Sequence, residues 1–253
     1  DGVYMSHQRN EFDGVVAATQ ETIRIGRESG IRVLTSHFKA CGKDNWGSLR
    51  QAVEVITAAR AAGVQVFADQ YPYTASATGL EAALLPRWSQ AGGRDSLMAR
   101  LDDPRTLERI KEGMIEGLAR RGGADRIQFR RYRPNESIEG QLLSEVSEER
   151  GQHPIDTAID LIKAGSVSIV SYNMNDEDVE TLMVQPWTMT SSDGGLVPLN
   201  EGVPHPRSYG TFARKIRLYV QEKGVVTLEH AIRSMTSLPA QVFGMTNRGM
   251  LRP

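Results

Sequence analysis

The stretches GVYMSH, at residues 2–7, and IRVLTSH, at residues 31–37, decide the fold of this chain. Each is a short apolar run that ends in Ser-His and is followed by a helical pattern of apolar residues that closes at Gly30 or Gly63. A third apolar run occupies residues 64–68. Strands that alternate with helices about every 30 residues indicate a parallel sheet with right-handed crossovers, and the closed form of that sheet is the TIM barrel.

The middle of the chain breaks this alternation, because helical patterns dominate it. We therefore expect barrel βα units over residues 1–80, an inserted lid-like subdomain over residues 81–165, and the last barrel strand or strands with C-terminal helices over residues 166–253. The further expected helices cover residues 97–121, 142–151, 154–164, 176–183, 210–223 and 227–235, and the further expected strands cover residues 127–131, 167–172 and 187–191.

Composition excludes several classes of partner. The 30 basic residues nearly balance the 31 acidic ones, so neither nucleic acid nor an anionic membrane surface is an expected partner. Apolar stretches are far shorter than the roughly 20 residues that span a bilayer, and the first residues lack the pattern of a signal peptide. A single cysteine, Cys41, leaves no internal disulfide and is typical of a reducing compartment. We expect a cytoplasmic protein.

Three polar residues follow expected strands directly: His7, His37 and Asp193. In a parallel barrel such positions converge on one face, which carries the active site. Two imidazoles and a carboxylate suit a divalent metal ion with an open water position. The metal lowers the pKa of its water to about 7, and an aspartate nearby can accept the proton and pass it to a leaving amine. Placement alone leaves the alternative open, because a loop histidine is more often solvated and an Asp-Gly after a strand is usually a turn.

The sequence around these residues carries a family resemblance. The segments YMSHQRNE (4–11), SHFKA (36–40), DQYPYT (69–74), SDG (192–194) and HPRSYGTF (205–212) closely resemble the N-acyl-D-amino-acid deacylases, or D-aminoacylases, of the amidohydrolase superfamily. They occur in the order of that family and near its spacing. The resemblance implies an α/β fold: the C-terminal half of a TIM-like (β/α)8 metal-dependent hydrolase barrel, with an inserted mostly helical subdomain. Residues 1–80 would then carry strands five to seven of the parent barrel.

The resemblance also implies a role for individual residues. His7 and His37 correspond to metal ligands, and Asp193 corresponds to the catalytic aspartate at the metal, which activates the water and protonates the leaving nitrogen. Arg207 suits the α-carboxylate of a D-amino acid, because a guanidinium can bind a carboxylate through two hydrogen bonds. The residues that we expect to contact the substrate are Lys39, Tyr71, Tyr73, His205 and Arg207.

The implied cofactor is Zn²⁺, as one or two ions, and the implied partner is a small N-acyl-D-amino acid. The family also has an N-terminal half with a His-x-His pair and a cysteine at the metal. This chain has five histidines but no His-x-His, and Cys41 lies in the wrong segment to be that cysteine. We therefore expect that the rest of the barrel is missing from this chain and that the metal site is incomplete. An oligomer is compatible with these features.

Two other functions remain open at this point. One is another amidohydrolase with the same barrel, such as a cyclic amide or dipeptide hydrolase, for which Arg207 would not be needed to bind a free carboxylate. The other is a non-catalytic fragment that binds no metal.

Overall fold

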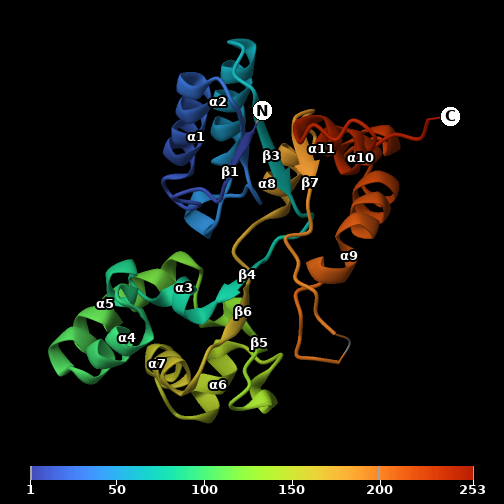
Figure 1. Cartoon of the computed structure of the whole chain (residues 1–253). Helices are drawn as coiled ribbons and strands as arrows, with labels where there is room; N and C mark the ends of the chain where they lie inside the picture. The colour runs from blue at the N-terminus through green and yellow to red at the C-terminus, as the bar shows by residue number, and fades with distance from the viewer. Residues whose placement is uncertain (1, 199, 253) are drawn as a thin grey trace. The chain divides into compact units, whose positions relative to one another are not determined.

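The computed structural model describes residues 2–198 and 200–252, which form two compact units (Figure 1). The described residues of unit 1 are 2–74, 174–195 and 206–252. Those of unit 2 are 75–173 and 196–205 without 199. Unit 1 is therefore interrupted twice in the sequence by segments of unit 2.

Unit 1 is built on a four-stranded parallel sheet. Its strands are β1 (Val3–Ser6), β2 (Arg32–Thr35), β3 (Val66–Gln70) and β7 (Thr188–Thr190), in the order β1-β2-β3-β7. Met5 lies opposite Leu34, Leu34 opposite Phe67, and Asp69 opposite Met189. Because all four strands run in the same direction, their C-terminal ends lie along one edge of the sheet. The residues that follow the strands meet at this edge.

Helices α1 (Val15–Ser29) and α2 (Leu49–Ala61) cover one face of this sheet, as Figure 1 shows in blue. Val33 and Val66 point to this face and pack in one apolar cluster with Ile23 of α1 and Ile56 of α2. Helix α1 ends where expected, at Gly30, whose φ of 71° is left-handed and therefore suits glycine. Helix α8 (Asp176–Met183) contributes Leu182 to the same cluster.

The opposite face of the sheet is only partly covered within the described residues. Leu34 and Met189 pack there against Leu238 and Val242 of α11 (Ser237–Val242), whereas Met5 is 53% exposed. The elements between β7 and α11 are α9 (Arg207–Arg214), the π-helical turns η5 (Lys215–Glu222) and α10 (Leu228–Met235). The predicted N-cap Thr227 is confirmed, because its side chain accepts a hydrogen bond from the backbone N–H of His230.

Unit 2 combines helices with a three-stranded antiparallel sheet. Its strands β4 (Ser76–Gly79), β6 (Ser168–Ser171) and β5 (Ile127–Arg131) pair in the order β4-β6-β5. Phe129 and Ile169 of this sheet are fully buried in one cluster with Ile110 and Ile162. The helices are α3 (Leu80–Leu84), α4 (Gly93–Asp102), α5 (Pro104–Arg120), α6 (Leu143–Glu149) and α7 (Pro154–Ala164). Short 3₁₀ turns are η1 (Lys43–Asn45) in unit 1 and η2 (Arg87–Gln90), η3 (Ala124–Arg126) and η4 (Glu136–Ile138) in unit 2.

Two expectations about the middle of the chain are corrected. The strand expected at residues 167–172 as a barrel strand is β6, which pairs antiparallel with β4 and β5 in unit 2. The helix expected over residues 97–121 is two helices, because Asp103 caps a new helix that begins at Pro104. Unit 2 is thus larger than the expected subdomain 81–165, and it includes a sheet as well as helices. Its role as a lid stays a prediction.

In the part of the chain that the structure describes, no helix is both long enough and apolar enough to cross a membrane.

Candidate active site

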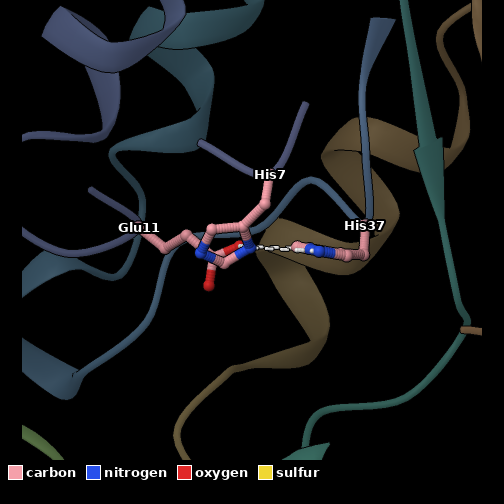
Figure 2. Close-up of side chains that lie close together, drawn as sticks. All are labelled: His7, Glu11 and His37. Atoms are coloured by element: carbon pink, nitrogen blue, oxygen red, sulfur yellow. Dashed lines mark hydrogen bonds and ion pairs between the residues drawn. The ribbon is translucent and has the colours of Figure 1, made fainter. Parts of the chain in front are cut away.

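His7 and His37 lie side by side at the C-terminal edge of the parallel sheet. His7 follows β1 directly, and His37 is the second residue after β2. The distance from His7 Nδ1 to His37 Nε2 is 3.1 Å, and the ring centroids are 4.8 Å apart (Figure 2). Two imidazole nitrogens at this separation can face the same ion. The structure therefore brings together two of the three residues expected to bind metal.

Glu11 is the third member of this cluster, and the sequence analysis did not single it out. Its Oε1 lies 3.1 Å from His37 Nδ1 and 3.5 Å from His7 Nδ1 (Figure 2). Among the described residues, His7, Glu11 and His37 are the only group of three that could hold a metal ion. An acidic residue four positions after His7 in the segment YMSHQRNE is the signal that could have identified it.

Lys39 is buried against this cluster. Its Nζ donates to Glu11 Oε1 at 2.6 Å and to the backbone oxygen of His37 at 2.9 Å. Lys39 was expected to contact the substrate, but the structure places its ammonium in an ion pair within the protein. Its contribution to a substrate site stays a prediction.

The charges of Glu11 and Lys39 stabilise each other. Burial favours the neutral form of Glu11, but the ammonium of Lys39 and hydrogen bonds from His37 and Lys39 outweigh it and lower the pKa of Glu11 to about 2. Burial likewise disfavours the ammonium of Lys39, but Tyr71 and the carboxylate of Glu11 raise the pKa of Lys39 above its ordinary value. Both groups are therefore charged at neutral pH.

Asp193 follows the end of β7. It is not in the group of three potential ligands, and its expected role as a metal ligand beside His7 and His37 stays a prediction. Its Oδ2 instead forms an ion pair with Arg207 Nη1 at 2.9 Å. Beside this pair, the backbone at Gly194 approaches the backbone at Ser208 closely. A Cβ on Gly194 would lie only 2.7 Å from Ser208 Cα.

Arg207 and Lys39 approach the same aromatic ring, that of Tyr71. The guanidinium carbon of Arg207 lies 4.6 Å from the ring centroid and Lys39 Nζ lies 5.9 Å from it, both within the range of cation–π attraction. Tyr71 is 1% exposed, its hydroxyl contacts the sulfur of Met174 at 4.0 Å, and burial raises its pKa to about 12. Tyr71 therefore packs against both cations as a neutral phenol.

Tyr73 and His205, both expected to contact the substrate, are buried in different units. Tyr73 donates its hydroxyl to the backbone oxygen of Pro206, next to Arg207, at 3.2 Å. His205 belongs to unit 2, where its Nε2 lies 2.9 Å from the backbone oxygen of Ala75. The expected roles of both residues in substrate binding stay predictions.

Backbone strain coincides with two of the candidate residues. Only three non-glycine residues in the described ranges have positive φ, and they are His37 at 39°, Asp193 at 47° and Asn200 at 68°. This conformation is unfavourable for residues with a Cβ, and it persists where surrounding contacts impose it, often at functional sites. The strain marks the turns after β2 and β7 as functional candidates independently of residue chemistry.

Sequence comparison finds relatives that match nearly the whole chain. An N-acyl-D-glutamate deacylase of Alcaligenes xylosoxydans xylosoxydans is 32% identical over 249 residues, which are 98% of this chain and 42% of the relative. A D-aminoacylase of the same organism is 33% identical over 251 residues, 99% of this chain and 43% of the relative. No protein-family model matches the chain. This chain spans less than half the length of the relatives that it matches.

Structure comparison gives the same result. The crystal structure of N-acyl-D-glutamate deacylase from Bordetella bronchiseptica, complexed with zinc and a phosphonate inhibitor that mimics the tetrahedral intermediate of the reaction, superimposes with a TM-score of 0.77. Sequence identity is 31%, and the match covers 99% of this chain and 44% of that one.

Proposed function

Because this chain is related over nearly its whole length to N-acyl-D-amino-acid deacylases, we propose that it forms part of a zinc-dependent amidohydrolase that cleaves the amide bond of N-acyl-D-amino acids. The products are a carboxylate and a D-amino acid. The pair of histidines at the C-terminal edge of the parallel sheet is the observation that carries this proposal.

The donor set suits zinc. Two nitrogen ligands of a tetrahedral Zn²⁺, each at about 2.05 Å, lie about 3.3 Å apart. The 3.1 Å between His7 Nδ1 and His37 Nε2 is close to this value. His7 and His37 would hold the ion, and the remaining ligands would come from outside this group. Bound zinc supplies Lewis-acid polarisation of the scissile carbonyl and lowers the pKa of a water molecule.

Glu11 orients His37 in this proposal rather than serving as a ligand. Nε2 of His37 faces His7, whereas Nδ1 lies 2.8 Å from Lys39 Nζ and 3.1 Å from Glu11 Oε1. In the tautomer whose Nδ1–H donates a hydrogen bond to Glu11, the lone pair of Nε2 is available to a metal ion and the ring orientation is fixed. Glu11 Oε1 already accepts from Lys39, which lowers its capacity to bind a cation directly.

Asp193 is the residue that we propose to transfer the proton. Its side chain is 37% exposed, so it can reach a reactant. A carboxylate accepts a proton from water and can return it to the leaving nitrogen. Arg207 also faces the α-carboxylate of the substrate in this proposal, and the planar guanidinium can serve Asp193 and a second carboxylate at once.

The parallel sheet supports the larger architecture. Strands β1 and β7 are the terminal strands of this sheet among the described residues, so each has an edge without a neighbour. We propose that further strands of the same protein continue the sheet at these edges and close it into a (β/α)8 barrel. The coverage of the relatives, 42% and 43%, is consistent with about half of such a barrel.

Metal binding by the purified chain is the first test. We expect about one Zn²⁺ per chain by plasma emission spectrometry after dialysis against zinc. His37→Ala is expected to lose it, whereas His153→Ala, which alters a histidine of unit 2 outside the cluster, is the matched control and is expected to retain it. Less than about 0.1 zinc per chain would contradict the idea that this chain alone forms a metal centre.

Hydrolysis by the full-length product of the gene is the second test. We expect release of the free amino acid from N-acetyl-D-glutamate or N-acetyl-D-aspartate and none from the L-isomers. Arg207→Gln is expected to raise KM sharply for these substrates, because the guanidinium that binds their α-carboxylate is lost. For a substrate whose carboxylate is amidated, the same variant is expected to change the kinetics much less. Equal rates with D- and L-isomers, or an unchanged KM in Arg207→Gln, would favour a different amidohydrolase.

A further inference from the structure

Asp69 connects the two strained turns of unit 1. It lies in β3, is 6% exposed, and accepts two hydrogen bonds through one oxygen, Oδ1. One comes from the backbone N–H of His37 at 2.9 Å and the other from the hydroxyl of Ser191. The backbone oxygen of Asp69 accepts a third bond, from the N–H of Phe38 at 2.8 Å.

These contacts act where the backbone is least favourable. His37 has a φ of 39°, and Asp193, two residues after Ser191, has a φ of 47°. Such conformations cost on the order of 1–3 kcal/mol each and persist only where surrounding groups hold them. A hydrogen bond to a carboxylate is shorter and stronger than one to a neutral acceptor. The carboxylate of Asp69 is therefore well placed to hold the turn of His37 directly and the turn of Asp193 through Ser191.

We propose that Asp69 is a positioning residue that fixes His37 for metal binding and Asp193 for proton transfer relative to one another. This inference rests on the proposed function, because it assigns Asp69 its role through those two residues. Asp69 sets the backbone of His37, whereas Glu11 sets the orientation of its ring. The contact from Asp69 therefore restrains the backbone of His37, and the contact from Glu11 restrains its side chain.

Four substitutions separate this role from a general contribution to folding. Asp69→Ala removes both hydrogen bonds, and Asp69→Asn keeps an acceptor oxygen that can occupy the place of Oδ1. Asp69→Glu keeps the charge but displaces the oxygen. Thr188→Val is the matched control, because Thr188 is a buried residue of the neighbouring strand β7 whose hydroxyl has no hydrogen-bond partner among the described residues.

The first measurement does not depend on metal. In the ¹⁵N-labelled chain, we expect the amide hydrogen of His37 to exchange at least about 10-fold faster in Asp69→Ala than in the parent, since its acceptor is lost. Nuclear Overhauser effects between the ring protons of His7 and His37 are expected to weaken in the same variant. Both are expected to be unchanged in Thr188→Val.

The second measurement is the affinity for Zn²⁺, by competition with a chromophoric chelator. We expect Asp69→Ala and Asp69→Glu to bind about 10- to 100-fold more weakly, the usual effect of removing a group that supports a ligand. Asp69→Asn is expected to stay within about threefold of the parent, because the acceptor is restored. A purely structural role would lower the melting temperature of these variants without this order of affinities.

Each outcome decides the inference. Unchanged exchange of His37 in Asp69→Ala overturns it, and so does zinc affinity in Asp69→Glu equal to that of the parent. Should Asp69→Ala fail to fold, the comparison of Asp69→Glu with Asp69→Asn decides instead, by the amide exchange of His37 and by the affinity for Zn²⁺. Should the parent chain bind no zinc, this chain alone forms no metal centre, and the amide exchange of His37 together with the ring contacts of His7 and His37 still decides whether Asp69 positions this residue.

Discussion

The histidine side of the candidate site, formed by His7, Glu11, His37 and Lys39, differs from the aspartate side, formed by Asp193, Arg207 and Lys215, in how it treats buried charge. Lys39 and Lys215 are both buried. Lys39 is paired with Glu11, and its pKa is raised. Lys215 donates only to the hydroxyls of Thr190 and Ser234 among the described residues, and burial lowers its pKa to about 8.

The comparison teaches that an opposite charge offsets the penalty that burial imposes on a charged group, whereas neutral hydrogen-bond partners leave that penalty in place. On the histidine side, the opposite charges of Glu11 and Lys39 neutralise each other inside the fold. On the aspartate side, the carboxylate is more than one-third exposed and the buried ammonium has neutral partners. The charges of Glu11 and Lys39 are therefore stabilised, whereas Lys215 is the buried ammonium that loses its proton more readily.

The largest expected effect is on the histidine side. Glu11→Gln leaves the ammonium of Lys39 buried without its counter-charge, and we expect the free energy of unfolding to fall by about 3–5 kcal/mol. Urea denaturation followed by circular dichroism measures it. Glu54→Gln, at an exposed position of α2, is the control and is expected to have little effect. A loss in Glu11→Gln no larger than that of the control would contradict the role of the ion pair.

An effect of opposite sign is expected on the aspartate side. Lys215→Met removes a buried charge that has no carboxylate partner, and we expect the free energy of unfolding to rise by about 1–4 kcal/mol at pH 7. Because the pKa of Lys215 is lower in the folded chain, at about 8, than in the unfolded chain, the unfolded state binds more protons above that value. The parent chain thus gains stability relative to Lys215→Met as the pH rises from about 8 towards 10.5.

Denaturation of Lys215→Met and its parent at pH 7 and pH 10 tests this sign. A stability difference that stays constant, or that grows with pH, would show that Lys215 is not the group responsible.

A smaller effect is expected from separating Asp193 from Arg207. A Cβ at position 194 would meet the backbone of Ser208 at 2.7 Å, so Gly194→Ala is expected to push the turn away from α9 and to cost about 1–3 kcal/mol, as overpacking usually does. Gly195→Ala is the matched control, because a Cβ there meets no atom within 4 Å. Thermal denaturation of both variants compares them, and equal melting temperatures would refute the close approach.

The smallest expected effect is that of Asp193→Asn. Its ion pair with Arg207 involves a carboxylate that water reaches, and such pairs contribute less than about 1 kcal/mol. We expect its free energy of unfolding to lie within about 1 kcal/mol of the parent while hydrolysis by the full-length protein is lost. A destabilisation as large as that of Glu11→Gln would remove the distinction between the two sides.

The parallel part of the fold was predictable because its strands and helices repeat a local pattern. The strand expected at residues 31–35 is β2, Arg32–Thr35, and the one expected at residues 64–68 is β3, Val66–Gln70. The second begins and ends two residues later than expected, which places Asp69 inside the strand. Apolar periodicity identifies a strand well but locates its ends poorly.

Sheet membership was not predictable for residues 167–172. A short apolar run such as β6 has the same composition whether its neighbours are parallel or antiparallel, because pairing is decided by contacts distant in sequence. The actual partners of β6 are β4 and β5, which lie about 90 and 40 residues earlier in the chain.

The candidate site was predictable in its histidines but not in its charges. His7 and His37 follow strands, and that placement alone predicts that they meet. Glu11 reaches them from a loop whose path no periodic pattern describes. Lys39 was expected to contact the substrate because the family resemblance implied it, and its ion pair with Glu11 was not foreseen. The ion pair of Asp193 joins it to Arg207, 14 residues later, whose position is set by tertiary packing.

The open edges of the parallel sheet have a practical consequence for anyone who prepares this chain alone. Strands β1 and β7 each end the sheet in the described structure, and Met5 leaves an apolar side chain exposed beside one of those edges. Rows of backbone N–H and C=O groups without a neighbour are templates for pairing between copies. Concentrated samples are therefore expected to self-associate edge to edge. Dilute refolding, or a charged residue in place of Met5, is the remedy that follows from the fold.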